Sequence, residues 1–246
     1  MRVLITNDDG ILAAGLQNIA QVVRGYDFVK EVWIVAPDRD KSCASHSMSF
    51  QKRVVVHKKS ENEFAVEGTP VDCVIIAICD LMKNCKPDLI ISGINMGANL
   101  DLDVFYSGTV SAAREGVLFG IPAIAISQFY YSSQDMIWQH NHDVFSDLLA
   151  ELMQLHQDKR VFDDRSLLNI NLPAKPVMGV KYLDQGAHHF GNHLEVLNEH
   201  QDGRSYIIGT KNLSVKSDNL QRGYITVTPL GVNLTNHDVL AHLKND

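Results

Sequence analysis

Two adjacent aspartates near the start of the chain, Asp8 and Asp9, are the residues whose type and spacing most directly indicate chemistry. Carboxylates this close repel each other, and the usual remedy is a hard cation bound through oxygen ligands. The hydroxyl of Ser42 and the amide oxygen of Asn95 would complete an all-oxygen set suited to Mg²⁺ or Mn²⁺. This interpretation predicts a metal site, with Asp8, Asp9 and Asn95 as candidate catalytic residues. A plain turn at residues 7–10 is the alternative, because Asn, Asp and Gly favour turns.

A hydroxyl- and glycine-rich segment at residues 106–109 is typical of an anion-binding site. Ser107, Gly108 and Thr109 come directly before an expected helix at residues 110–118, and the backbone N–H groups at a helix start attract phosphate. No Glu or Gln follows three residues after Ser107 or Thr109, so no capping box competes for those N–H groups. The segment therefore predicts a phosphate cradle, although a plain Ser or Thr helix cap explains it equally well.

Apolar runs alternate with helical patterns over the first two thirds of the chain, and this order predicts an α/β fold. The expected strands lie at residues 3–6, 32–36, 88–92, 121–127 and 167–172, the expected helices at 16–23, 71–82, 110–118 and 136–156, and a hairpin at 53–66. Such alternation implies a mostly parallel sheet with helices on both faces. Because the carboxyl ends of parallel strands converge on one crevice, Asp8, Ser42 and Asn95 should meet in space.

The sequence pattern changes after Pro173, because the segments that follow are more polar, have strand character and are separated by glycines. We expect residues 1–173 to form the core domain and residues 174–246 to form a β-rich C-terminal arm that ends in a helix near residues 236–243. Arms of this kind are often exchanged between protomers.

Composition and charge exclude several classes of protein. The formal net charge of −7 and the pI near 5.8 argue against binding of duplex nucleic acid, which needs clustered Lys and Arg. The first ten residues match neither a signal peptide nor a membrane span, which predicts a cytoplasmic protein without a membrane partner. The four cysteines form no CxxC pair and are expected to be free thiols.

Several motifs occur together in a distinctive order: MRVLITNDDG, VAPDRDKSCASHS, GTPVDCV, ISGINMGANL, YSGTVSAAREG and IPAIAIS. Over residues 1–127, and again near residues 217–230, the chain resembles the survival protein SurE family. The resemblance implies a Rossmann-like core and a metal-dependent nucleotidase acting on nucleoside 5′- and 3′-monophosphates. It also implies a homodimer or homotetramer built by an exchanged C-terminal arm.

Motif by motif, the resemblance implies a role for individual residues of this chain. The implied ligands of one divalent ion per subunit are Asp8, Asp9, Ser42 and Asn95, and the implied substrate-binding residues are Ser107, Gly108 and Thr109 with Asn7 beside the metal ligands. The chain departs from the family pattern at Cys43, where the family usually has glycine, and at Ala14, where it usually has proline. The first departure concerns the bend of the loop that carries Ser42.

The expected reaction is phosphomonoester hydrolysis by a water activated by the metal, with Asp8 as the more suitable acceptor of the water's proton. A phosphoaspartyl enzyme is the alternative phosphatase, but such enzymes usually carry two acids separated by one residue. A metal-dependent nucleotide-binding module without catalysis is the alternative from another class. A structural protein would leave the clustering of acids and amides at strand ends unexplained.

Overall fold

The computed structural model describes residues 1–130, 142–163, 165–188, 194–200, 203–208 and 217–244. The strands are β1 (Arg2–Thr6), β2 (Glu31–Pro37), β3 (Val56–Lys58), β4 (Glu63–Val66), β5 (Leu89–Met96), β6 (Ala123–Gln128), β7 (Ser166–Leu172), β8 (Gly179–Tyr182), β9 (Leu194–His200), β10 (Gly203–Ile208) and β11 (Tyr224–Gly231). The helices are α1 (Ala14–Arg24), α2 (Pro70–Ile76), α3 (Gly108–Leu118), α4 (His142–Gln154), α5 (Asp218–Gln221) and α6 (His237–Leu243), with a π-helical turn η1 (Ala77–Leu81) and a 3₁₀ helix η2 (Asp101–Phe105).

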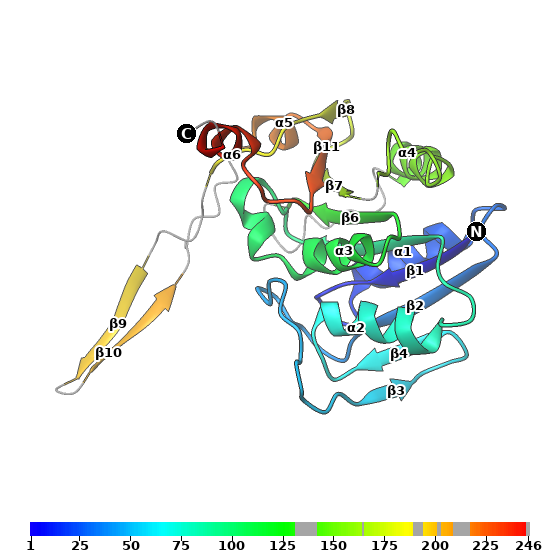
Figure 1. Ribbon diagram of the computed structural model, residues 1–246, viewed down its shortest axis with the longest axis horizontal. Helices are drawn as coiled ribbons and strands as arrows, with labels where there is room; N and C mark the ends of the chain where they lie inside the picture. The colour runs from blue at the N-terminus through cyan, green and yellow to red at the C-terminus, as the bar shows by residue number, and fades with distance from the viewer. Residues whose placement is uncertain (131–141, 164, 189–193, 201–202, 209–216, 245–246) are drawn as a thin grey trace.

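The predicted α/β fold is confirmed by a sheet whose strands run in the order β3-β4-β2-β1-β5-β6-β7-β11-β8 (Figure 1). The pairs from β4 through β7 are parallel, whereas β3 and β11 run antiparallel to β4 and β7. All the expected strands are present. The expected helix at 71–82 begins as α2 under a Thr69 capping box and continues as η1, and residues 136–141 of the expected helix at 136–156 lie outside the described residues.

Helices cover both faces of the sheet, as the alternating pattern predicted (Figure 1). Successive side chains of a strand point to opposite faces, so Val3 and Ile5 pack with residues of α1 and α4, while Leu4 packs with residues of α2 and α3. The central strands are apolar on both sides for this reason. Among the described residues, no helix has the length and apolar character needed to span a bilayer.

The register of the central strands brings the motifs to one edge. Thr6 at the end of β1 is paired with Ser92 of β5, so the residues that follow Thr6 and those that follow Ser92 emerge side by side. The β5–β6 pairing then shifts between Ser92 and Asn95. This irregularity ends the apolar part of β5 and turns Asn95 and the residues after it toward Asp8 and Asp9.

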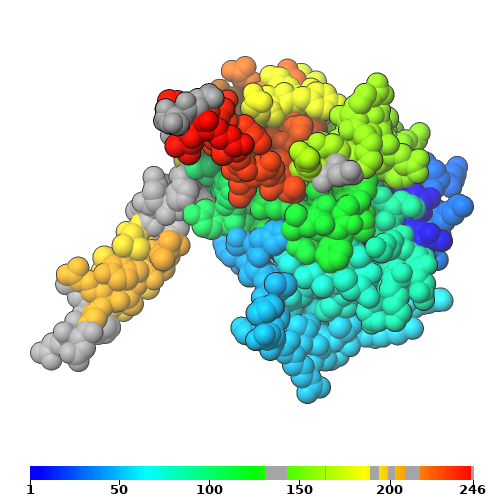
Figure 2. All heavy atoms as spheres, viewed as in Figure 1, coloured from blue at the N-terminus to red at the C-terminus, as the bar shows by residue number. Residues whose placement is uncertain are grey.

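The C-terminal region contributes to the main sheet and also leaves it. β11 and β8 extend the sheet beyond β7, whereas β9 and β10 form a separate antiparallel hairpin that projects from the body of the molecule (Figures 1 and 2). The hairpin exposes apolar side chains, among them Leu194, Tyr206 and Ile208. The division at residue 173 and the exchange of the arm stay predictions.

Candidate metal and phosphate site

A cavity of about 190 Å³ lies at the carboxyl ends of β1 and β5. It is lined by Asp8, Ser42, Cys43, Asn95, Met96, Gly97, Ala98, Asn99, Asp103, Tyr106 and Ser107. The structure thus brings Asp8, Ser42, Asn95 and Ser107, which come from four separate segments, to one cavity. Asp9, Gly108 and Thr109 do not line the cavity, but each contacts a residue that does: Asp9 contacts Met96, and Gly108 and Thr109 contact Asp8.

Asp8 is buried at the base of this cavity, with 4% of its surface exposed. One carboxylate oxygen, Oδ1, accepts a hydrogen bond from the Thr109 hydroxyl, and the Asp8 carbonyl accepts one from the Lys41 N–H at 2.8 Å. Burial raises the pKa of the Asp8 carboxyl, and the bond from Thr109 opposes part of that rise. Asp8 is therefore held in place by contacts that leave its charge largely uncompensated.

Asp9 adds a second carboxylate beside the first. Its Oδ2 accepts a hydrogen bond from the Met96 N–H at 3.1 Å, which ties the end of β1 to the end of β5. Burial, followed by repulsion from Asp8, raises the pKa of Asp9 to about 6. Within the described residues, neither Asp8 nor Asp9 forms an ion pair with a Lys, Arg or His side chain. A buried acid next to a half-buried one, neither with a cationic partner, is an arrangement that a bound cation stabilises.

Asn95 reaches the cavity because β5 bends at Gly93. Gly93 has a φ of +135°, and a Cβ there would lie 2.2 Å from the Ile126 carbonyl oxygen of the neighbouring strand. Glycine is thus required where the two strands approach. The Asn95 amide nitrogen donates to the Gly97 carbonyl at 2.7 Å, and this bond leaves the amide oxygen as the acceptor available to a ligand.

Ser42 lies in a loop that is anchored at several points. Its hydroxyl and its N–H both donate to Asp40 Oδ1, at 2.6 and 2.7 Å. Three residues on, the Ser45 N–H donates to the Tyr106 carbonyl, and His46 Nε2 lies 2.7 Å from Glu115 Oε2 on α3. Cys43 has a φ of +59°, the left-handed conformation that favours glycine. The departure from the family glycine therefore falls at a position where glycine has a physical advantage.

The start of α3 packs directly against Asp8. Ser107 is the N-cap, and its hydroxyl accepts from the Val110 N–H at 3.0 Å, so the helix-cap interpretation of this segment is confirmed. At Gly108, a Cβ would lie 2.7 Å from the Asp8 Cβ and 2.9 Å from its Oδ2. The absent side chain lets the positive end of the helix dipole approach the carboxylate, which favours negative charge at this spot.

The structure changes the roles expected for two asparagines: Asn7, predicted to bind substrate, does not line the cavity, whereas Asn99, which was not predicted, does. Asn7 is fully buried, does not line the cavity, and exchanges two hydrogen bonds with Gly10, so its side chain shapes the turn. Asn99 lines the cavity, although its place in the motif ISGINMGANL did not single it out. It donates to Ser127 Oγ at 2.7 Å and to Asn171 Oδ1 at 2.8 Å. No local pattern marked it, because residues 97–100 form an irregular segment without helical or strand periodicity.

The donor set fits a hard divalent cation. Asp8 and Asp9 offer carboxylate oxygens, Asn95 an amide oxygen and Ser42 a hydroxyl. In the described part of the chain, no group of three or more His, Cys, Asp or Glu is placed to hold a metal ion. The fold and the site together define a Rossmann-like α/β protein with a candidate cation site, built on carboxylates, beside a helix N-terminus.

Comparisons with known proteins give this class a family. The family model described as "Survival protein SurE" matches residues 3–192, and the chain belongs to that family. A protein of Wolbachia pipientis wMel named "5'-nucleotidase SurE" is 38% identical, with 100% of this chain and 96% of that one covered. The "5'-nucleotidase SurE 1" of Burkholderia lata is also 38% identical, with coverages of 99% and 95%. The crystal structure of the SurE protein from Aquifex aeolicus superposes with a TM-score of 0.82 at 29% identity and covers 100% and 99%.

Proposed function

We propose that this protein is a divalent-metal-dependent nucleotidase, a phosphoric monoester hydrolase that converts nucleoside 5′- and 3′-monophosphates to nucleoside and phosphate. Relatives that match essentially the whole chain carry the name 5′-nucleotidase SurE. The observation that carries the proposal is the buried Asp8 carboxylate, which has no cationic partner among the described residues and shares one cavity with Ser42, Asn95 and the start of α3.

The proposed ligands of one Mg²⁺ or Mn²⁺ ion per subunit are Asp8, Asp9, Ser42 and Asn95. When bound, the ion would neutralise phosphate charge and lower the pKa of a water molecule. All four side chains present oxygen atoms, and the two acids carry raised pKa values in the protein alone. A cation would lower both pKa values and offset the repulsion between the two carboxylates.

The protein's own groups bind and orient the substrate in this proposal. The phosphate lies against the N-terminal turn of α3 at Ser107, Gly108 and Thr109, where the helix dipole favours an anion. Asp8 accepts the proton of the attacking water, since its carboxylate lines the cavity in which the water and the phosphate meet. The hydrogen bond from the Thr109 hydroxyl fixes the rotamer of Asp8, and Asn7 holds the turn from which Asp8 and Asp9 project.

Phosphate release from a panel of 5′- and 3′-mononucleotides, with EDTA, Mg²⁺ or Mn²⁺, tests the proposal. We expect metal-stimulated release, and a loss of roughly 10³-fold or more in kcat for Asp8→Asn with an unchanged circular dichroism spectrum. Asp27→Asn, which changes an exposed aspartate after α1, is the matched control and should retain full activity. Near-normal turnover by Asp8→Asn would overturn the role of Asp8. Nucleotide binding without phosphate release would identify a non-catalytic binding module.

The exposed hairpin supports a homodimer or homotetramer. Leu194, Tyr206 and Ile208 present apolar surface on a segment that projects from the body (Figure 2), and such surface is usually covered in an assembly. We propose that a second copy of the chain covers it through exchange of the arm at residues 174–246. Light scattering after chromatography tests this, because Ile208→Asp should shift the protein toward the monomer. A monomeric wild type would overturn the proposal.

A cytoplasmic location is also proposed, since all four cysteines are free.

A further inference from the structure

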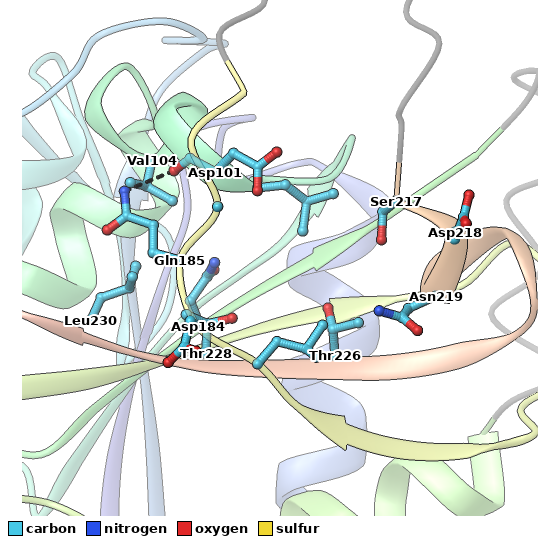
Figure 3. Close-up of a pocket in the computed structure, with 14 residues that line it drawn as sticks. Asp101, Val104, Asp184, Gln185, Ser217, Asp218, Asn219, Thr226, Thr228 and Leu230 are labelled. Atoms are coloured by element: carbon cyan, nitrogen blue, oxygen red, sulfur yellow. Dashed lines mark hydrogen bonds between the residues drawn. The ribbon is translucent and has the colours of Figure 1, made fainter.

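A second and larger cavity, of about 300 Å³, lies beside η2, whose residues Asp101 and Val104 contribute to its wall (Figure 3). Five segments line it: η2 and the residue before it, the chain after β8, the start of α5, β11, and one residue of β7. The lining residues are Leu100, Asp101, Val104, Asn169, Leu183, Asp184, Gln185, Gly186, Ser217, Asp218, Asn219, Thr226, Thr228 and Leu230. The proposed nucleotidase reaction uses none of them.

Two buried polar atoms in the floor of this cavity have no hydrogen-bond partner among the described residues. They are Oγ1 of Thr226, whose residue is 1% exposed, and Oδ1 of Asn169, whose residue is 2% exposed. Figure 3 shows the Thr226 hydroxyl on the cavity side of β11. A buried polar atom without a partner is unfavourable for folding, so its presence in a cavity wall points to a ligand that supplies the partner.

Other side chains of the wall are held in fixed orientations. Asn219 Oδ1 accepts from the Lys181 ammonium at 2.9 Å, which turns the Asn219 amide nitrogen toward the cavity as a donor (Figure 3). The Gln185 amide nitrogen donates to the Asp101 carbonyl at 2.9 Å and leaves its own oxygen as an acceptor. The cavity therefore offers oriented donors and acceptors rather than one kind alone.

The charged and apolar side chains of the wall restrict the chemical class of ligand that the cavity could bind. Three carboxylates line the cavity, those of the exposed Asp184 and Asp218 and of the half-buried Asp101. No Lys or Arg lines the cavity within the described parts of the chain, so a phosphate would be repelled. Four apolar side chains contribute to the wall: Leu100, Val104, Leu183 and Leu230. An uncharged molecule with hydroxyl groups and one flat apolar face suits this combination, and the volume lies at the lower end of the range for small-molecule pockets.

We propose that this cavity binds a nucleoside, with ribose hydroxyls on the polar floor and rim and the base against the apolar wall. The choice of a nucleoside rests on the proposed function, because that reaction releases one. The site also contacts the first cavity: the Asn169 amide nitrogen donates to the carbonyl of Asn99 at 2.8 Å, and Asn99 lines the first cavity. The carboxylates of this cavity repel the phosphate of a nucleotide but not an uncharged nucleoside, so the cavity should prefer the product of the reaction to its substrate.

Calorimetric titration of the full-length protein with adenosine in EDTA tests this site without turnover. We expect one nucleoside per subunit, with AMP at least tenfold weaker under the same conditions. Thr226→Val removes the hydroxyl at nearly constant volume and should weaken adenosine binding at least tenfold. Because it also removes an unpartnered buried group, the same variant should keep or raise the melting temperature, whereas loss of a structural residue would lower it. Thr226→Ser retains the hydroxyl and should retain binding.

Three results would overturn the proposal: no adenosine binding to the wild type, equal binding by Thr226→Val, or AMP binding tighter than adenosine in EDTA. Phosphate release from AMP with Mn²⁺ is measured separately. If that reaction fails while adenosine still binds, the proposed nucleotidase function falls and the nucleoside site stands. If adenosine fails to bind while phosphate is released, the reverse holds.

Discussion

The two cavities, both lined in part by residues of η2, use polar groups in opposite ways. The smaller cavity is lined by the buried Asp8 and adjoins the half-buried Asp9, and both carboxyls have raised pKa values and no cationic side-chain partner in the described part of the molecule. The larger cavity buries the neutral groups of Asn169 and Thr226, while its carboxylates, at Asp101, Asp184 and Asp218, are half-buried or exposed. A buried anion calls for a cation, whereas a buried hydroxyl or amide calls only for a hydrogen bond.

This difference explains how one fold could bind the proposed metal and phosphate in one cavity and the proposed nucleoside in the other. Short motifs that follow β1, β2 and β5 build the smaller cavity, and the register of parallel strands positions them. Segments that lie far apart in the sequence build the larger one, and it depends on how β8, α5 and β11 return to the sheet. Changes near Asp8 should therefore affect metal and phosphate but not adenosine, and changes near Thr226 should do the reverse.

The largest effect that would sharpen this contrast is expected from Gly108→Ala. The added Cβ would lie 2.7 Å from the Asp8 Cβ, so the carboxylate or the start of α3 must move. A displacement near 1 Å typically lowers turnover by about 10²-fold. Steady-state phosphate release from AMP with Mn²⁺ measures this, while adenosine binding in EDTA should be unchanged. Gly203→Ala, where a Cβ meets nothing within 4 Å, is the control. Full activity of Gly108→Ala would mean that the approach of α3 to Asp8 is unimportant.

Metal binding should stabilise the fold through the smaller cavity alone. At a concentration near 100 times the dissociation constant, Mn²⁺ contributes about 2.7 kcal/mol, or roughly 5–10 °C in melting temperature. Asp9→Asn should remove most of this increase, and Thr226→Val should retain it. Differential scanning calorimetry with EDTA or Mn²⁺ measures the shift. An equal shift in Asp9→Asn and wild type would exclude Asp9 as a ligand.

Without metal, the paired acids should destabilise the protein in a pH-dependent way. The pKa of Asp9 is raised from 3.8 to about 6 in the fold, so the folded state holds this proton more tightly than the unfolded state. The unfavourable contribution is absent below about pH 4, grows as pH rises, and is complete above about pH 6. In EDTA at pH 8, Asp9→Asn should therefore melt about 2–4 °C above the wild type. The gap should close at pH 4, and a gap that widens on acidification would contradict this origin.

The smallest effect concerns the loop that carries Ser42. Cys43 adopts a φ of +59°, which glycine adopts without strain, whereas glycine loses more backbone entropy on folding. The net gain for Cys43→Gly should be about 0.5 kcal/mol, measured by urea unfolding in EDTA. Adenosine binding should not change, because no residue of this loop lines the larger cavity. A loss of stability would show that the Cys43 side chain makes a favourable contact that outweighs the strain.

Much of the core and of the smaller cavity could be predicted from residue types. Apolar runs at residues 3–6 and 88–92 imply buried parallel strands, and parallel strands necessarily deliver Asp8 and Asn95 to the same edge. Thr69 and Pro70 marked the start of α2 because their side chains act locally, within one helical turn. The use of Ser107 as a cap was left open, since a cap and an anion cradle share the same residues.

The sequence by itself determined the alternation of elements and the acids that end β1, because periodicity and turn chemistry act over a few residues. Only the tertiary structure decided that Thr109 and Gly108 contact Asp8 and that Asn99 lines the site. The larger cavity could not be predicted from short sequence patterns either. Asn169 and Thr226 are ordinary polar residues of strands, and they become a cavity floor only because β7 and β11 pair across a long connection. Such pairings depend on which distant surfaces bury each other, and no short pattern carries that information.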